Sequence, residues 1–439
     1  MTLLNWKKIL KSSLVASLTL PFFGTTAAFA EETDMEVEAE SAILIDFDTS
    51  QILYNQNAED QRGIASMTKM LVEYILFEEI EAGNIDWDTE ITISEYAHNI
   101  SQNYALSNVP LHMGGTYTVQ ELYESLAIYS ANGATIALAE EIEGSEEAFV
   151  DRMRELVESW GITDYELYNT TGLNNSFLMG NHYSGSEEDA ENYMSAKGIA
   201  IVSQRLIADY PEVLETASVP TKTFREGTSD AIGMMNWNWM LEGLSHERMD
   251  VDGLKTGTTQ IAGATFAGTA EADGRRLVSV VMGAGDGFSN RGQRFEETSK
   301  LFDYGFDHFT FESIIEKEMN LDAEHNIPVR NGLEEDVSLV TTESLELYLP
   351  EGADMDQFSY TFVPDEDKLN QNGEVEAPIS IGENLGVLVV DNLDDIEFVD
   401  GETPDTIKVA AAESVERAGF VTVMTNWLRD FFSGLSDRF

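Results

Sequence analysis

The chain has 439 residues, of which 43% are hydrophobic and 10% aromatic, so it can bury at least one large core and is not a disordered protein. It has 80 acidic against 25 basic residues and a formal net charge of −55, which would repel phosphate backbones and excludes a nucleic-acid partner. It has no cysteine, so neither disulfides nor cysteine metal sites are expected.

The acidic residues are spread along the chain rather than gathered in one tail. Self-repulsion of this size opposes the compact state unless salt screens it. The charge distribution therefore predicts a protein adapted to high salt.

The N-terminus has the pattern of an export signal. Lysines near the start precede a mostly apolar run over 12–23, and Ala28-Phe29-Ala30 gives a small-x-small cleavage pattern. We expect 1–30 to be a cleaved signal peptide. A retained membrane anchor is the alternative, but the apolar run is shorter than the roughly 20 residues that a spanning helix needs.

The next segments predict strands at both ends of a helical region. Residues 41–58 read as two strands joined by a polar turn, and 264–284 read as a hairpin turning at 272–274. Between them, apolar residues at helical spacing predict a helix that starts at or just after Ser66. Further helices are expected over 118–130, 134–143 and 145–161. We therefore predict a sheet built from distant parts of the chain and covered by helices.

The residue pattern changes in the C-terminal part of the chain. Short strand-like segments separated by acidic and Gly/Pro turns predict a small all-β domain over 313–409. Within 410–439, Phe420, Met424 and Trp427 fall on one helical face, which favours a helix lying in a membrane interface. Docking of this helix on the β domain or on a second subunit is the alternative.

A Ser-x-x-Lys motif lies at the start of the first predicted helix. Side chains three positions apart on a helix are within reach of each other. A serine hydroxyl is a poor nucleophile until a base takes its proton, and a buried lysine near other cations can be that base. We predict Ser66 as nucleophile and Lys69 as base, with the Ser66 backbone N–H facing a developing oxyanion. A plain helix cap is the alternative for Ser66.

The second motif, Ser130-Ala131-Asn132, follows a predicted helix and precedes Gly133. Ser130 is suited to relay a proton to a leaving group. Asn132 is suited to hold a substrate amide.

The third motif is Lys255-Thr256-Gly257. Lys255 and Thr256 offer a cation and a hydroxyl to a substrate carboxylate. Gly257 would let a substrate backbone approach a strand edge, and the backbone N–H of Thr258 is expected to be the second oxyanion donor.

Each motif alone is weak evidence, but the three in this order are the set found in penicillin-binding proteins and class A β-lactamases. The chain resembles the low-molecular-mass penicillin-binding proteins, specifically the D-alanyl-D-alanine carboxypeptidases. The resemblance also includes "YNTTGLNN" at 168–175, "VDGLKTGTT" at 251–259 and the helix-like segment 294–309.

The resemblance implies the α/β (α+β) transpeptidase fold of penicillin-binding proteins and β-lactamases. The serine carboxypeptidase domain would occupy 31–312, followed by a small β domain over 313–409. An amphipathic membrane-anchoring helix over 410–439 would hold the enzyme at the extracytoplasmic face of the cell membrane.

The resemblance also implies the chemistry. Ser66 would attack the carbonyl between two D-alanines of a peptidoglycan stem peptide, and water would hydrolyse the acyl-enzyme. β-Lactams would be covalent inhibitors. Arg294 matches a family arginine that helps to bind the substrate carboxylate, with Arg291 as a competing candidate. Some relatives have histidine where this chain has Thr258. No cofactor is implied, and the scattered histidines show no metal-ligand spacing.

The sequence leaves two other functions open. A β-lactamase shares the acylation chemistry but uses an added carboxylate to deacylate, and Glu166 lies in about the right interval, although its spacing to Asn169 fits poorly. A non-catalytic wall-binding protein with a decayed site is the alternative from another class. The intact motifs argue against decay.

Overall fold

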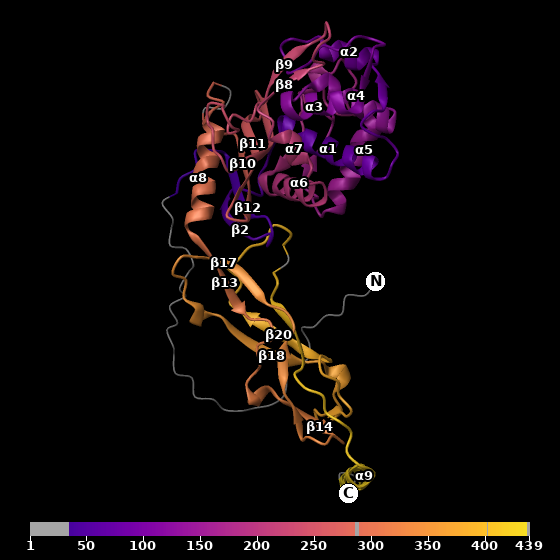
Figure 1. The fold of residues 1–439 in the computed structure, drawn as a ribbon, viewed down its shortest axis with the longest axis vertical. Coiled ribbons are helices and arrows are strands. Elements are labelled where there is room, and N and C mark those ends of the chain that lie inside the picture. Colours follow the sequence, from indigo (N-terminus) through magenta and orange to yellow (C-terminus); the bar gives the residue numbers. More distant parts are fainter. Residues whose placement is uncertain (1–34, 286–288, 402, 437–439) are drawn as a thin grey trace. The chain divides into compact units, whose positions relative to one another are not determined.

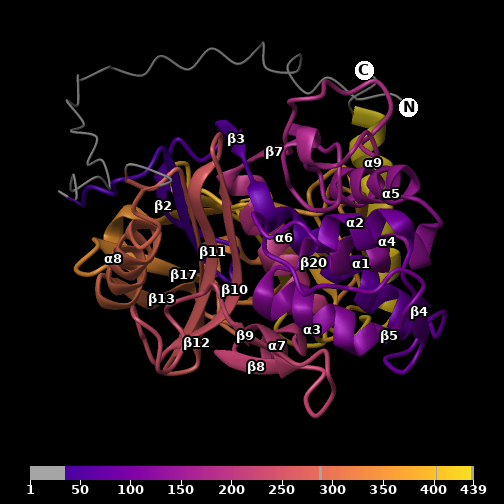
Figure 2. The same cartoon turned by 90° about the horizontal axis from the view of Figure 1, so that it is seen from above.

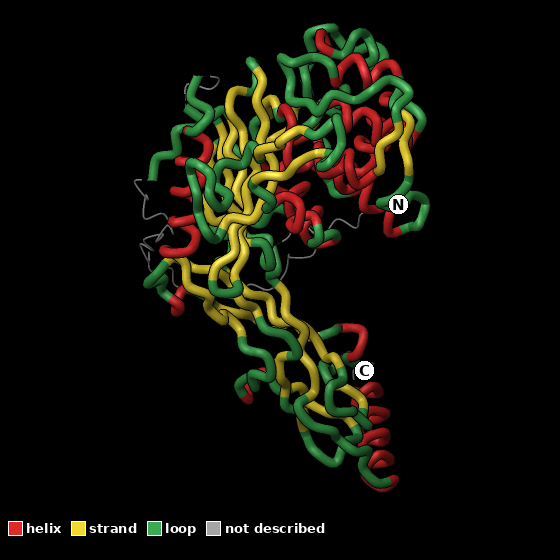
Figure 3. Tube along the Cα trace, turned by 45° about the horizontal axis from the view of Figure 1, so that its top comes forward, coloured by secondary structure: helices red, strands yellow, loops and turns green. Residues whose placement is uncertain are grey.

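The computed structural model describes residues 35–285, 289–401 and 403–436. The predicted signal peptide lies outside these residues. Helices, shown in red in Figure 3, are α1 Lys69–Glu81, α2 Glu95–Ser101, α3 Val119–Tyr129, α4 Asn132–Glu143, α5 Glu146–Ser159, α6 Ala196–Asp209, α7 Val213–Ala217, α8 Gln293–Asp307 and α9 Phe420–Ser436.

Strands are found at both ends of this helical region and throughout the C-terminal part (Figure 1). They are β1 Ser41–Asp46, β2 Ile52–Gln56, β3 Gln61–Gly63, β4 Glu90–Thr92, β5 Thr116–Thr118, β6 Tyr165–Glu166, β7 Tyr193–Ser195, β8 Thr221–Phe224, β9 Ile232–Met235, β10 Val251–Thr259, β11 Gly263–Ala272, β12 Arg275–Met282, β13 Phe309–Ile315, β14 Ile327–Arg330, β15 Asp336–Val337, β16 Leu339–Thr341, β17 Leu345–Pro350, β18 Ser359–Pro364, β19 Val375–Glu376, β20 Asn384–Asp391 and β21 Thr406–Ala411.

The main sheet has the order β10-β11-β12-β1-β2, and its neighbouring strands are antiparallel. Strands from both ends of the region pair directly, with Ser41 opposite Met282. The sequence prediction of a sheet made from distant segments is confirmed, as is the α+β fold class. The strand that contains the Lys-Thr-Gly motif, β10, lies at the edge of this sheet.

Alternating side chains of the sheet enter two different cores because successive residues of a strand face opposite sides. Ile43 and Val280 pack with the helices that follow Ser66, whereas Leu44 and Val281 pack with Phe302 of α8. Figure 2 shows the sheet between α8 on one side and the other helices of this region on the other. The sheet is therefore covered on both faces, and β10 carries the motif past the first residues of α1.

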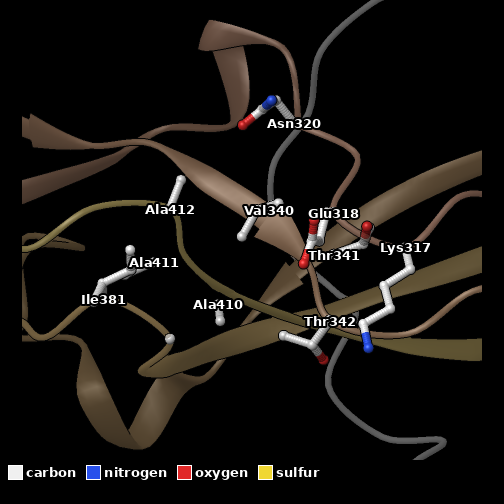
Figure 4. A pocket seen from close by; sticks show the side chains of 11 residues that line it. Lys317, Glu318, Asn320, Val340, Thr341, Thr342, Ile381, Ala410, Ala411 and Ala412 are labelled. Atoms are coloured by element: carbon white, nitrogen blue, oxygen red, sulfur yellow. The ribbon is translucent and has the colours of Figure 1, made fainter.

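The C-terminal strands form their own sheets, including β16-β21-β20-β18, around a further cluster of aliphatic side chains. The sequence placed a helical pattern from 410 onward, but β21 continues to Ala411 and α9 begins at Phe420. The alanines at this point fit the sheet because Ala411 is fully buried against the aliphatic cluster. A cavity of about 400 Å³ opens beside β16 and β21 and contains none of the predicted site residues (Figure 4).

Candidate active site

The turn that carries Ser66 is held by a close contact with a distant loop. Ser66 lies in a 3-10 turn, Ala65–Thr68, that leads directly into α1. Ala65 has a left-handed backbone with φ of 46°. A Cβ atom on Gly172, whose φ is +73°, would lie 1.7 Å from the carbonyl oxygen of Ala65. Only glycine fits there, so the Asn-Thr-Thr-Gly segment packs directly on the serine turn.

Lys69 is fully buried, and its side-chain nitrogen has three neighbours at hydrogen-bond distance. Nζ is 2.8 Å from Ser66 Oγ, 2.9 Å from Asn132 Oδ1 and 2.7 Å from the carbonyl oxygen of Thr171. Burial, and then the charge of Lys255, lower the pKa of Lys69 well below its usual value. A neutral Lys69 can therefore donate its two hydrogens to Asn132 and Thr171 and accept the Ser66 proton on its lone pair.

The Ser130-Ala131-Asn132 motif forms the break between α3 and α4. Ser130 ends α3 in a left-handed conformation with φ of 57°, and Asn132 is the first residue of α4. The Asn132 backbone N–H and its Nδ2 each donate to the carbonyl oxygen of Ser107 at 3.0 Å. These contacts hold the Asn132 side chain with its oxygen toward Lys69.

The Lys-Thr-Gly motif on β10 lies directly beside the serine turn. A Cβ atom on Gly257 would come within 2.4 Å of Thr265 Oγ1, 2.8 Å of the Ile64 carbonyl oxygen and 3.0 Å of Ala65 Cβ. The sequence analysis assigned the space at Gly257 to a substrate backbone, whereas the structure fills it with this chain's own residues. The glycine is thus needed for β10 to approach the nucleophile.

Lys255 is 3% exposed, and its Nζ donates to the Thr256 carbonyl oxygen at 3.3 Å. Burial lowers the pKa of Lys255, and the carboxylate of Glu73 counteracts that shift. The Thr258 hydroxyl donates to the carbonyl oxygen of Gly257 at 2.7 Å. The motif therefore contributes a buried cation close enough to Lys69 to affect its pKa.

Arg294 is buried on α8 and binds the same strand. One guanidinium nitrogen donates to the Gly257 carbonyl oxygen at 2.7 Å, to Thr258 Oγ1 at 2.9 Å and to the Thr265 carbonyl oxygen at 3.1 Å. Burial, followed by the charge of Arg291, lowers the pKa of Arg294 to about 9. At 1% exposure, the Arg294 side chain is too deeply buried to belong to a surface ion pair.

Sequence reasoning missed three residues of the site. Thr171 supplies a carbonyl to Lys69, Ser107 orients Asn132, and Glu73 is a buried carboxylate one turn after Lys69. The four-residue spacing of Lys69 and Glu73 on one helix was a visible signal for Glu73. Nothing in the sequence indicates that Ser107 approaches Asn132.

No group of His, Cys, Asp or Glu side chains suited to hold a metal ion occurs in the described part of the chain. What the fold and these contacts define is a serine acyl-transfer site: a serine at a helix start, a buried lysine beside it, and a second buried lysine on the adjoining strand.

Comparisons with known proteins agree with that class. Residues 27–286 match the D-alanyl-D-alanine carboxypeptidase family, so the chain belongs to this family. The chain is 29% identical over 430 residues to D-alanyl-D-alanine carboxypeptidase DacF of Bacillus subtilis, covering 97% of this chain and 99% of the relative. It is 28% identical over 400 residues to DacA of Escherichia coli, covering 90% and 88%.

Solved structures show the same relationship. PBP3 of Streptococcus pneumoniae, described as a peptidoglycan synthesis regulatory factor, matches with a TM-score of 0.69 and 36% identity, over 87% of this chain and all of that one. Penicillin-binding protein 5 of Haemophilus influenzae matches with a TM-score of 0.65 and 25% identity, over 88% and 99%. Penicillin-binding protein D2 of Listeria monocytogenes, solved with cefotaxime bound, matches with a TM-score of 0.52 and 27% identity, over 62% and 99%.

Proposed function

We propose that this protein is a serine D-alanyl-D-alanine carboxypeptidase that removes the terminal D-alanine from peptidoglycan stem peptides, with Ser66 as nucleophile and Lys69 as its base. The observation that carries these assignments is the 2.8 Å contact between Lys69 Nζ and Ser66 Oγ in a buried site. Family membership supports the reaction class.

The first step forms the acyl-enzyme. Lys69 takes the Ser66 proton as Oγ attacks the carbonyl carbon between the two D-alanines, and the N–H groups of Ser66 and Thr258 stabilise the oxyanion. The proton then passes through Ser130 to the leaving nitrogen, the C–N bond breaks, and D-alanine departs. Lys255, with Thr256 and Arg294, binds the terminal carboxylate, while Asn132 offers its second Nδ2 hydrogen to a substrate amide.

The second step regenerates the enzyme. Water attacks the ester carbonyl after giving a proton to Lys69, and that proton returns to Ser66 Oγ as the ester bond breaks. A β-lactam would acylate Ser66 in the same way, but its leaving nitrogen stays tethered in the adduct.

The β-lactamase alternative needs a carboxylate that activates the deacylating water. Glu166, the candidate from the sequence, is exposed on β6, and its carboxylate accepts a hydrogen bond from the Tyr168 hydroxyl at 3.0 Å. Among the described residues, no hydrogen bond links Glu166 to Ser66 or Lys69. Without such a carboxylate, water should hydrolyse the penicilloyl ester on Ser66 slowly, which favours the carboxypeptidase.

The test is the intact mass of the protein after brief exposure to benzylpenicillin, compared with Ser66→Ala. We expect a lasting adduct of one penicillin on the protein and none on the variant. Rapid loss of penicillin without an adduct would assign a β-lactamase instead. A folded protein that neither binds nor destroys penicillin, and releases no D-alanine from an N-acylated D-Ala-D-Ala peptide, would overturn the proposal.

We also propose that the enzyme is exported and bound to the outer face of the cell membrane through α9. Phe420 is 78% exposed and Trp427 60%, and Met424 and Leu428 are exposed on the same helix. Side chains at this spacing form one apolar face, which supports interfacial binding over docking on the strands. No helix in the described segments has the length and apolarity needed to span a bilayer.

Removal of 420–439 tests this anchor. Val415 is buried in the C-terminal core, so the cut must come after it. We expect the truncated protein to leave the lipid-vesicle pellet while keeping its rate of acylation by penicillin. A truncated protein that still sediments with vesicles would contradict the anchor.

A further inference from the structure

The Thr171 carbonyl that binds Lys69 belongs to a short turn over 169–173, called here the carbonyl turn. Asn169 sets its shape. The Oδ1 atom of Asn169 accepts hydrogen bonds from the Thr171 N–H at 3.1 Å, the Thr171 hydroxyl at 2.9 Å and the Gly172 N–H at 2.7 Å. Because these bonds are internal to the carbonyl turn, they do not set its distance from the nucleophile.

Asn192, the residue before β7, holds the carbonyl turn from outside. Its Oδ1 accepts hydrogen bonds from the N–H groups of Tyr168 at 2.8 Å and Asn169 at 3.3 Å. Its Nδ2 donates to the Asn169 carbonyl oxygen at 2.8 Å. Asn192 is fully buried, so these bonds are made without competition from water.

The same residue also binds the chain on both sides of the nucleophile. Asn192 Nδ2 donates to Thr68 Oγ1 at 3.0 Å, and the Asn192 backbone carbonyl accepts from the Ile64 N–H at 3.0 Å. Ile64 and Thr68 lie just before and just after Ser66 in the chain. An asparagine amide has two N–H hydrogens and an oxygen with two lone pairs, and Asn192 uses all of them. Asn192 therefore joins the serine turn to the carbonyl turn.

Glu146 supports the carbonyl turn from another direction. Its Oε1 accepts hydrogen bonds from the Thr170 N–H and the Thr170 hydroxyl, each at 2.9 Å. Glu146 is the first residue of α5, and its Oε2 accepts from the Tyr96 hydroxyl at 2.6 Å. These contacts attach the carbonyl turn to the helices. The direct attachment to the residues around the nucleophile comes from Asn192.

We propose that Asn192 is a positioning residue for the catalytic base: it holds the carbonyl turn against the serine turn and thereby sets the Thr171 carbonyl beside Lys69 Nζ. When neutral Lys69 donates both of its hydrogens to fixed acceptors, its lone pair is left facing Ser66 Oγ. If the Thr171 carbonyl moves away, the amine can rotate, and the lone pair faces Ser66 for only part of the time. This inference rests on the proposed function, since it takes Lys69 as the base.

The inference predicts a loss of turnover without a loss of substrate binding. Asn192 is fully buried, so it cannot touch the substrate, and KM should not change. Lys69 takes a proton in both steps of the proposed mechanism, so kcat should fall whichever step is slower. An equal fall in kcat and kcat/KM is the sign of an interaction that acts only in the transition state.

The experiment measures kcat and KM for release of D-alanine from an N-acylated D-Ala-D-Ala peptide. Asn192→Leu keeps the approximate size of the side chain and removes its hydrogen bonds. We expect kcat to fall about 10²-fold, the effect of a small displacement in an active site, with KM unchanged. Prolonged exposure to benzylpenicillin should still bring every chain to one adduct in the intact mass, which shows that the whole population is folded.

Gln51→Met is the matched control, because it also removes a buried amide that joins two distant segments. Gln51 is 4% exposed, its Nε2 donates to the Tyr348 carbonyl oxygen at 2.6 Å, and its Oε1 accepts from the Tyr348 N–H at 2.9 Å. These bonds connect the turn before β2 with β17, and none of them involves a residue of the site. Both kcat and KM should equal those of the unmodified protein.

Thr68→Val is a milder variant that tests the inference if Asn192→Leu does not fold. It removes only the hydroxyl that accepts from Asn192 Nδ2 and leaves a side chain of the same shape. We expect kcat to fall about tenfold, as for the loss of one buried hydrogen bond, with KM again unchanged. Where both single variants fold, the double variant should be no slower than Asn192→Leu alone, because the bond between the two residues is already absent.

Several outcomes would overturn the inference. They are a folded Asn192→Leu or Thr68→Val with unchanged kcat, a fall in kcat that Gln51→Met shares, and a rise in KM that accounts for the whole loss of kcat/KM. Losses that multiply in the double variant would also overturn it, since the two residues would then act independently. If the unmodified protein releases no D-alanine, the proposed function fails instead, so the two failures are distinguishable.

Discussion

The two parts of the chain treat buried charge in opposite ways. Around the main sheet, Lys69, Glu73, Lys255 and Arg294 are each at most 4% exposed. Within the described residues of the C-terminal strands, the buried polar side chains are only Asn331 and Thr341, and the core is otherwise aliphatic. Both parts nevertheless contain antiparallel strands whose apolar side chains are buried.

This difference indicates that the first part of the chain gives up some stability in order to bury groups that take part in catalysis. A buried ion is less favourable than a well-packed apolar side chain of similar volume, so a core without charges is the simpler solution, as in the C-terminal part. Shifted pKa values gather where groups must exchange protons. The buried charges of the first part are therefore expected to be sensitive to substitution in activity, and the apolar core of the second part in stability alone.

The largest effect is expected from Lys69→Ala, which removes the base. Acylation by a fluorescent penicillin should fall about 10³-fold, because general base catalysis is lost. Lys222→Ala, at an exposed lysine, should leave the rate unchanged. An acylation rate for Lys69→Ala within a factor of about two of the original, well below the usual 10²–10⁴-fold effect, would remove the functional explanation for the buried charge.

Gly172→Ala disturbs the packing of the catalytic part without removing a charge. Its new Cβ would collide with the Ala65 carbonyl oxygen and displace the serine turn, and a displacement of about 1 Å can lower a rate about 10²-fold. We expect the acylation rate to fall by that factor. Gly180→Ala is the control, since Gly180 has a similar φ of +83° and no atom within 4 Å of the added Cβ. Equal rates for the two variants would show that the packing on Ala65 is not needed.

Leu388→Ala tests the other side of the comparison. Leu388 is fully buried in the C-terminal core, and its truncation should lower the free energy of unfolding by about 2–5 kcal/mol. Urea unfolding followed by circular dichroism measures the loss, and the acylation rate of the folded variant should not change. Leu71→Ala, at an equally buried leucine of α1, should lower both. A parallel loss of acylation in Leu388→Ala would show that the two parts are energetically coupled to catalysis.

The smallest effect is expected from salt, which should not discriminate between the two parts. The net charge of −55 destabilises the compact state by self-repulsion, and salt shortens the range of that repulsion to about 3 Å at 1 M. Added NaCl should therefore raise the melting temperature by a few degrees. A melting temperature that falls with NaCl would contradict the predicted adaptation to high salt.

The sequence by itself determined the elements whose signals are local. The Ser66–Lys69 pair was predictable because two residues three positions apart at the start of a helix lie within reach of each other, and the structure places the two side chains in contact. The strands of the sheet and the helices between them followed from apolar periodicity in the same way. The family resemblance, carried by three short motifs, likewise indicated the reaction class.

Only the tertiary structure decided how the distant segments meet. Gly257 contacts the serine turn rather than leaving an open edge, Arg294 is buried against β10, and the Thr171 carbonyl binds Lys69. The spacing of Lys69 and Glu73 on one helix was visible in the sequence, but the effect of the Glu73 charge on the pKa of Lys255 was not, because β10 reaches the start of α1 only through the folding of the sheet. Long-range packing and the low dielectric of a buried site have no local signal in the sequence, and they set which of the two lysines is the base.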